Sequence, residues 1–283
     1  MAHGAATIVN AIASGRGAAF GLDLWTKAEV KLTNEATIIT GTISSDPEEK
    51  TTLIEKTVAR VFLRFGVERQ FGAKVTTSSS IPIARGLKSS SAAANAIALA
   101  TVAALTEELD DLSVINLGVD GAFDAKVTVT GAFDDACASY FGGVVVTDNS
   151  TRKLLKRFPL PNGLTVLLHV PTNKAYTGDT DVNRLATIKS AVKAAFKEAQ
   201  SGNLWKALTQ NGIAYSSALG YDNSIAEHAL AAGALAAGLC GKGPAVTAVV
   251  PDAKLDAVKA AMRSHEGKVL EAHFNSQKAR VVK

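Results

Sequence analysis

The chain has 283 residues, enough for one large domain or for two smaller ones that share a cleft. Hydrophobic residues make up 47% of it and charged residues 20%, which indicates a globular protein with a well-filled core. The net charge of +4 is spread out and aromatic residues make up only 6%, which argues against the clustered basic face of a nucleic-acid-binding protein and suits a small anionic ligand.

Up to residue 150 the hydrophobic pattern predicts a mixture of strands and helices. Strands are expected over 7–13, 28–32, 37–42, 74–79 and 144–148. Helices are expected over 47–65, 90–105 and 113–125. The strands over 28–32 and 37–42 are expected to pair as a hairpin, and the glycine-rich stretch 13–23 is expected to connect two strands.

From about residue 150 the pattern starts again. Strands are expected over 164–169, 247–250 and 268–274. Helices are expected over 182–200, 204–217, 224–232 and 255–263. Pro159 and Pro161 interrupt the pattern between the halves, so we predict an α+β chain with domains over 1–155 and 156–283.

Cysteine and histidine placement gives no sign of a disulfide framework or a zinc site. Cys137 and Cys240 lie far apart, and the histidines show no metal-ligand spacing. No basic segment leads into an apolar stretch near residue 1, and the apolar run over 229–240 is far below the roughly 20 residues of a membrane span. We therefore expect a cytoplasmic protein, a monomer or small homo-oligomer, with no membrane or nucleic-acid partner.

The most informative segment is 82–94, where a proline and a glycine frame a loop and three serines open an alanine-rich helix. Serine hydroxyls favour a helix N-terminus, and the free N–H groups there form an anion site with the helix dipole. Arg85 and Lys88 add positive charge, so the expected guest is a phosphate. A serine pair alone is more often a plain helix cap. The Gly-x4-Gly-Lys-Ser/Thr nucleotide loop does not fit here, because Leu87 precedes Lys88.

Two further segments carry candidate chemistry. The stretch 130–143 places Asp134 and Asp135 after a flexible loop and ends in two glycines. Such a pair is often only a helix cap, but a positioned carboxylate can also accept a proton from a hydroxyl. The stretch 238–247 is a second glycine-rich loop, which is weak evidence by itself.

Together these segments resemble the motifs of the GHMP small-molecule kinases, in the family's order. The stretch 82–93 resembles the family's phosphate loop, with Ser91 in place of its first alanine. The amino-acid sequences of segments 6–12, 85–92 and 130–138 are similar to those of the archaeal type of shikimate kinase. That resemblance implies ATP and Mg²⁺ as cofactors and phosphorylation of the 3-hydroxyl of shikimate, on the route to chorismate and the aromatic amino acids.

The resemblance also implies an architecture and a set of site residues. The fold should be the two-domain GHMP kinase fold, an N-terminal α/β domain and a ferredoxin-like C-terminal domain with the active site in the cleft between them. The expected ATP-binding residues are Ile83, Ala84, Arg85, Gly86, Leu87, Lys88, Ser89, Ser90, Ser91, Ala92 and Ala93.

The resemblance makes Asp134 the catalytic base and places Arg16 where the family has a lysine near the catalytic centre. Arg16, Asp23 and Asp134 are the expected substrate-binding residues. Ser90 is an expected magnesium ligand, and Asp124 is the nearest carboxylate to the position of the family's second ligand, a glutamate that this chain lacks.

Several assignments stay open at this point. The basic candidates for the shikimate carboxylate are Arg16, Lys27, Arg85, Lys174 and Arg184. The polar run 172–180 is either a lid or a plain surface loop. The alternatives for the whole chain are another GHMP kinase, homoserine kinase above all, and a non-catalytic member that binds a nucleotide or metabolite.

Overall fold

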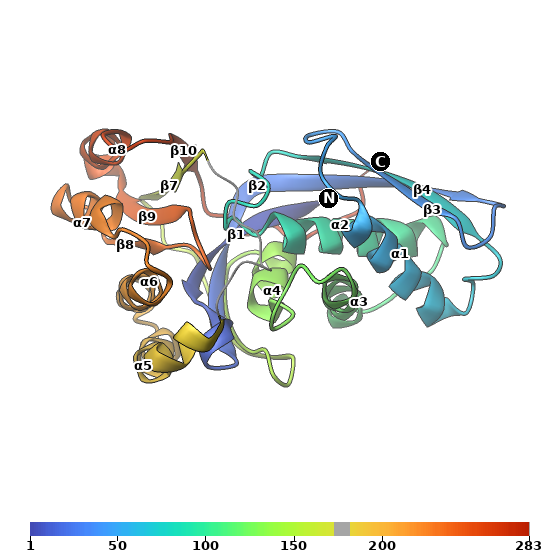
Figure 1. Cartoon of the computed structure of the whole chain (residues 1–283), viewed down its shortest axis with the longest axis horizontal. Coiled ribbons are helices and arrows are strands. Elements are labelled where there is room, and N and C mark those ends of the chain that lie inside the picture. The colour runs from blue at the N-terminus through green and yellow to red at the C-terminus, as the bar shows by residue number, and fades with distance from the viewer. Residues whose placement is uncertain (173–181, 283) are drawn as a thin grey trace.

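The architecture comes from a computed structural model that describes residues 1–172 and 182–282. Within these residues the strands form two sheets that lie next to each other along the long axis of the molecule (Figure 1). The first sheet contains β1 (Ala2–Val9), β2 (Arg16–Thr33), β3 (Ile39–Ile43), β4 (Gly72–Ser79), β5 (Val144–Asp148) and β6 (Lys153–Phe158). The second contains β7 (Leu164–Val170), β8 (Ala236–Leu239), β9 (Val246–Pro251) and β10 (Lys268–Ala272).

The first sheet is organised around the long strand β2. Its order is β3-β4-β2-β5-β6, and β1 pairs with β2 off this path. Four helices lie together on one side of the sheet (Figure 1): α1 (Thr52–Phe65), α2 (Ser89–Ala104), α3 (Asp111–Asp124) and α4 (Phe133–Phe141). Of these, α2 and α4 pack directly on β1 and β2. The starts of the two helices lie close together, because Lys88 just before α2 pairs with Asp135 in the first turn of α4.

The second sheet has the order β10-β7-β9-β8, and all of its neighbours are antiparallel. Its first and third strands in chain order are therefore central, as in a ferredoxin-like domain. Its helices are α5 (Lys189–Gln200), α6 (Leu204–Leu219), α7 (Ser224–Ala231) and α8 (Leu255–Arg263). The predicted two-domain α+β fold is confirmed.

One hydrophobic cluster joins the two sheets. It contains Ile8 and Phe20 of the first sheet together with Leu168 and Phe196 of the second half, all of them buried. Helix α6 also reaches the first sheet, because the hydroxyl of Tyr215 donates to the carbonyl of the residue that follows β1 and accepts from an N–H three residues later. The short helix that follows β1, η1 (Ala11–Ala13), is therefore held from both halves.

The chain termini lie side by side at the first sheet (Figure 1), where the amino group of Met1 donates to the carbonyl of Arg280. In the part of the chain that the structure describes, no helix combines the length and apolar character that crossing a bilayer requires.

Four local predictions are wrong. The strand expected over 7–13 ends at Val9, and residues 11–13 form η1. The strands over 28–32 and 37–42 do not form a hairpin, because β4 inserts between β2 and β3 and pairs with both. The glycine-rich stretch 13–23 is mostly the first half of β2 and not a connection. The helix expected over 182–200 is divided into a 3-10 segment, η3 (Val182–Ile188), and α5.

Strands β6 and β8 are absent from the prediction. The predicted domain division between residues 155 and 156 stays a prediction; it falls inside β6, so a cut there would split a strand.

Candidate active site

The phosphate loop leads into α2 through an irregular backbone. Ala84, Gly86 and Lys88 all have positive φ, of 54°, 84° and 62°. Left-handed residues at alternate positions are typical of loops whose N–H groups gather around an anion. Lys88 is the residue before α2, so Ser89 to Ser91 form the first turn, where the N–H groups and the helix dipole point toward the loop.

A polar pocket of ≈ 120 Å³ opens in front of this turn. It is bounded by the segment after β1, the phosphate loop, the loop before α4, the first turn of α4 and the second glycine-rich loop. Its lining residues are Asn10, Ala11, Ile12, Ala84, Gly86, Lys88, Ser89, Ser90, Ser91, Val127, Thr128, Val129, Thr130, Ala132, Asp134, Asp135, Lys242 and Gly243. The segments 82–94, 130–143 and 238–247 therefore meet at one pocket, although they lie far apart in the sequence.

Asp134 lines this pocket and is only 3% exposed. Its Oδ1 accepts a hydrogen bond of 2.7 Å from Nδ2 of Asn149, and Oδ1 of Asn149 accepts another from Thr147. Its Oδ2 lies against the Cα of Gly17, where any Cβ would overlap the carboxylate. The side chain is therefore held on both sides by residues of β2, β5 and the turn after β5.

Burial and the neighbouring Asp135 carboxylate raise the pKa of Asp134 to about 7, against the smaller opposing effects of Lys88 and Asn149. A carboxylate with a pKa near the working pH can both take up and release a proton, which general base catalysis requires.

Lys88 and Asp135 form a second buried feature of the pocket. Nζ of Lys88 lies 3.0 Å from Oδ2 of Asp135, and the two side chains are 12% and 8% exposed. Burial works against the ammonium charge, but the carboxylates around it outweigh this and raise the pKa of Lys88. The ammonium also lies against the Cα of Gly241, where a Cβ would overlap it. The second glycine-rich loop can approach Lys88 this closely because residue 241 is a glycine.

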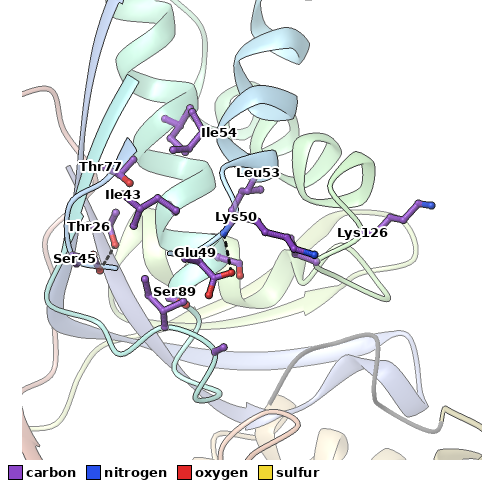
Figure 2. A pocket seen from close by; sticks show the side chains of 17 residues that line it. Thr26, Ile43, Ser45, Glu49, Lys50, Leu53, Ile54, Thr77, Ser89 and Lys126 are labelled. Carbon is purple, nitrogen blue, oxygen red and sulfur yellow. Dashed lines mark hydrogen bonds between the residues drawn. The ribbon is translucent and has the colours of Figure 1, made fainter. Parts of the chain in front are cut away.

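An apolar pocket of ≈ 210 Å³ lies on the other side of the first turn of α2. Figure 2 shows its side chains, which come from β2, β3, α1, β4 and α2 and from the segments between elements. Ile43, Leu53 and Ile54 give it an apolar wall, and Glu49, Lys50 and Lys126 also line it. It shares Ser89 and Ser90 with the polar pocket, so the two pockets meet at the same helix end. The sequence did not reveal this pocket, because its apolar residues have the same pattern as core residues.

Most residues of the predicted phosphate loop line one of the two pockets, namely Ile83, Ala84, Gly86, Lys88, Ser89, Ser90, Ser91 and Ala93. Leu87 and Ala92 instead pack into the core that joins the two sheets. Arg85 lines a separate pocket with Ser45, Asp46 and residues 79–83, and its carbonyl accepts a hydrogen bond from the N–H of Ala245. Arg85 thus contacts the second glycine-rich loop through its backbone.

Three other predicted site residues do not join this group. Arg16 is 55% exposed, and its guanidinium pairs with Asp148 at 3.3 Å. Asp23 accepts a hydrogen bond from the N–H of His273 and pairs with its ring. None of the residues that line the polar pocket is Arg16 or Asp23. In a strand, alternate side chains face opposite ways, which turns Arg16 away from the side on which Gly17 meets Asp134.

Asp124 ends α3, and both of its oxygens accept hydrogen bonds from Arg60 of α1, at 2.5 and 2.6 Å. It lines neither pocket, whereas Ser90 lines both, so the structure does not bring these two residues to one pocket; their role as metal ligands stays a prediction. The ion pair explains why a carboxylate stands at this position, because it ties two neighbouring helices together.

The remaining basic candidates are scattered. Lys27 lies over the ring of Trp25, and Arg184 lies on η3. Lys174 lies outside the described residues, as does the predicted lid from residue 173 onward. Lys242, which the sequence did not single out, lines the polar pocket next to the phosphate loop.

Known proteins share this fold. The family description "GHMP kinases N terminal domain" matches residues 52–143. The crystal structure of Methanococcus jannaschii mevalonate kinase aligns with a TM-score of 0.78 and 17% identity over 97% of each chain. The structure of Lactococcus lactis galactokinase aligns with a TM-score of 0.77 and 15% identity, over 99% of this chain and 94% of its own. The fold is therefore that of the GHMP kinases.

Closer relatives define a narrower group. A protein of Methanosarcina mazei named shikimate kinase is 46% identical over 98% of this chain and 94% of its own length. Another of the same name, from Pyrococcus abyssi, is 43% identical over 89% of this chain and 90% of its own. The chain belongs to the archaeal shikimate kinase family of GHMP kinases.

Proposed function

We propose that this chain transfers the terminal phosphoryl group of ATP to the 3-hydroxyl of shikimate. The observation that carries the proposal is the 46% identity, over nearly the whole chain, to a protein named shikimate kinase. The polar pocket supports it, because an anion-binding helix end and a buried carboxylate face the same small space.

ATP would occupy both pockets. Its base fits the apolar pocket, where Ile43 and Leu53 offer apolar contacts, and its phosphates fit the N–H groups at the start of α2. Because Ser89 and Ser90 border both pockets, one molecule can lie across the helix end with its terminal phosphate in the polar pocket. Shikimate would then occupy the rest of the polar pocket, beside Asp134.

In the transfer step, the 3-oxygen of shikimate forms a bond to the terminal phosphorus while the bond from that phosphorus to the bridging oxygen breaks, and ADP leaves. The proton of the hydroxyl passes to Asp134. Asn149 and Gly17 hold this carboxylate in one position, which matters because small displacements of a reacting group are costly.

Magnesium is the cofactor that the family implies, and the donor set of the polar pocket fits it. Hydroxyl oxygens of Ser90 and Thr130 line the pocket, and oxygen is the ligand that Mg²⁺ prefers. Among the described residues no cluster of three His, Cys, Asp or Glu side chains could hold a metal, so the phosphates of ATP would supply the other ligands. We propose Ser90 as the protein ligand; the bound ion would offset phosphoryl charge.

The test is an ADP-release assay with Mg–ATP and the purified chain, with shikimate, homoserine and mevalonate in parallel. Turnover with shikimate alone, and a product that mass spectrometry identifies as a shikimate monophosphate, is the expected result. Turnover with homoserine alone would make the chain a homoserine kinase. ATP binding without turnover in any well would favour the non-catalytic alternative. The reaction would take place in the cytoplasm, where ATP is available.

A further inference from the structure

The polar pocket holds three charged side chains that are almost entirely buried. Asp134 and Asp135 come from the first turn of α4, and Lys88 comes from the phosphate loop. Two neighbouring carboxylates share a single ammonium group, which pairs with only one of them, at 3.0 Å. Buried charges are costly, so an unbalanced set of this kind calls for a reason beyond stability.

The ammonium of Lys88 has little freedom to leave this position. Lys88 has a left-handed backbone with φ of 62°, an uncommon conformation for a residue with a side chain. Its Nζ lies between Oδ2 of Asp135 and the Cα of Gly241. The positive charge is therefore fixed between the two halves of the molecule, next to the carboxylates.

Asp135 is held on one oxygen only. Its Oδ2 pairs with Lys88, whereas its Oδ1 is buried without a hydrogen-bond partner among the described residues. Because no hydrogen bond offsets the negative charge on this buried oxygen, the charge acts on neighbouring groups. The carboxyl of Asp134, the preceding residue, lies in the same helical turn.

We propose that Lys88 and Asp135 together set the proton affinity of Asp134 and so act as positioning residues for the transfer. The inference rests on the proposed role of Asp134 as the base. Lys88 favours the charged carboxylate and Asp135 disfavours it, so the balance of the two decides how readily Asp134 takes the proton of the acceptor hydroxyl.

The other groups around Asp134 do not compete for this role. Burial raises the pKa of Cys137 and of Tyr215, so the thiol and the phenol both stay protonated. Asn149 is neutral, and Lys242 is a further cation that lines the same pocket. Of these two cations, Lys88 has the larger effect on the pKa of Asp134.

Of the other charged groups on the elements packed against α4, several carboxylates and cations pair elsewhere, as Arg16–Asp148, Lys278–Asp111, Arg152–Asp120, Arg60–Asp124 and His273–Asp23. Lys27 lies over the ring of Trp25, and Glu29 and Lys31 lie in the second half of β2. Arg157 of β6 lies over the ring of Phe141, at the other end of α4 from Asp134. His3, on β1, has a pKa lowered by burial and is neutral.

The arrangement also differs from the one that the sequence suggested. Arg16 stands where the family has a lysine near the catalytic centre, yet its guanidinium pairs with Asp148 at the surface. The cation beside the catalytic carboxylate comes instead from the phosphate loop, at the position just before its serines.

The first test compares the pH dependence of kcat at saturating ATP and shikimate. Lys88→Met removes the positive charge near Asp134, so the acidic limb of the plot of kcat against pH should move up by about one pH unit or more. Asp135→Asn removes the negative charge next to Asp134, so the same limb should move to lower pH. Lys206→Met is the matched control, because Lys206 pairs with Glu198 at 2.7 Å on the exposed side of α6, and its limb should not move.

A purely structural role for the pair would lower kcat in both variants without opposite movements of the limb, and that result would overturn the inference. Absence of shikimate turnover in the unmodified chain would instead count against the proposed function. The two failures are therefore separate.

A second measurement does not depend on activity. The ¹³C resonance of the Asp134 carboxyl, assigned with Asp134→Asn, can be titrated in the protein without nucleotide. Its midpoint should rise in Lys88→Met and fall in Asp135→Asn, while retained circular dichroism spectra show that both variants are folded. Equal midpoints in all three proteins would overturn the inference even if the variants lack activity.

Discussion

The two pockets at the start of α2 differ in the side chains that set their character. The apolar pocket is walled by side chains such as Ile43 and Leu53, which would be equally at home in a core. The polar pocket collects Asp134, Asp135 and Lys88, which are costly to bury. The contrast teaches that one helix end borders two different environments, and under the proposed function one of them binds the base of ATP and the other holds the reacting groups.

This division predicts that changes in the two pockets separate kinetically. A change in the polar pocket should lower kcat while ATP still binds. A change in the apolar pocket should weaken ATP binding and leave kcat almost intact.

The largest effect should come from Asp134→Asn. Asparagine keeps the size of the side chain but cannot accept the hydroxyl proton, so kcat should fall by about a hundredfold or more. ATP affinity, measured by calorimetry, should stay close to that of the unmodified chain. A variant with nearly full kcat would remove Asp134 from the mechanism.

Gly17→Ala should have the next largest effect. A methyl group here would overlap the Asp134 carboxylate, so the carboxylate must move. We expect kcat to fall by about tenfold or more, because a displacement of this kind spoils the geometry of proton transfer. Steady-state kinetics would check this; an unchanged kcat would show that the position of Asp134 is not critical.

Leu53→Ala tests the other pocket. Loss of this partly buried side chain should raise the Kd for ATP by about tenfold, since it removes apolar contacts worth about 1.4 kcal/mol. Leu63→Ala is the matched control, because Leu63 lies on the same helix and is 60% exposed. A large fall in kcat for Leu53→Ala would contradict the division between the pockets.

The same contrast explains how much the sequence could predict. Helices α2 and α3 and strand β5 begin and end within about two residues of the expected positions, since local periodicity and turn residues define them. The phosphate loop was also found, because a glycine, a lysine and three serines stand within six residues. Local signals are sufficient for local features.

Features made by distant residues were missed. The expected hairpin failed because β4, which begins at Gly72, inserts between β2 and β3. Strand β8 was missed because its alanine-rich sequence has no strand pattern. The contacts of Asp134 with Asn149 and Gly17 depend on how β2, β5 and α4 pack, so no spacing in the sequence announces them.

The smallest expected effect is on stability, and it depends on pH. Burial and Asp135 raise the pKa of Asp134 to about 7, whereas an aspartate in an unfolded chain titrates near pH ~4. The folded chain thus holds the proton more tightly, and the resulting stabilisation is full below about pH 4 and lost as the pH rises through about 7. Asp134→Asn removes this loss.

The melting temperature of Asp134→Asn, relative to the unmodified chain, should therefore increase from acidic to neutral pH, by on the order of 5 °C.

Asp148→Asn should show the opposite trend. Although burial opposes it, hydrogen bonds from Thr151 and Arg16 lower the pKa of Asp148, so this carboxylate stabilises the fold above the pH at which an unfolded aspartate titrates. Thermal melts at several pH values would check both. If the melting temperatures of the two variants changed with pH in the same direction, the pKa values of Asp134 and Asp148 would not be shifted in opposite directions, which would contradict the prediction.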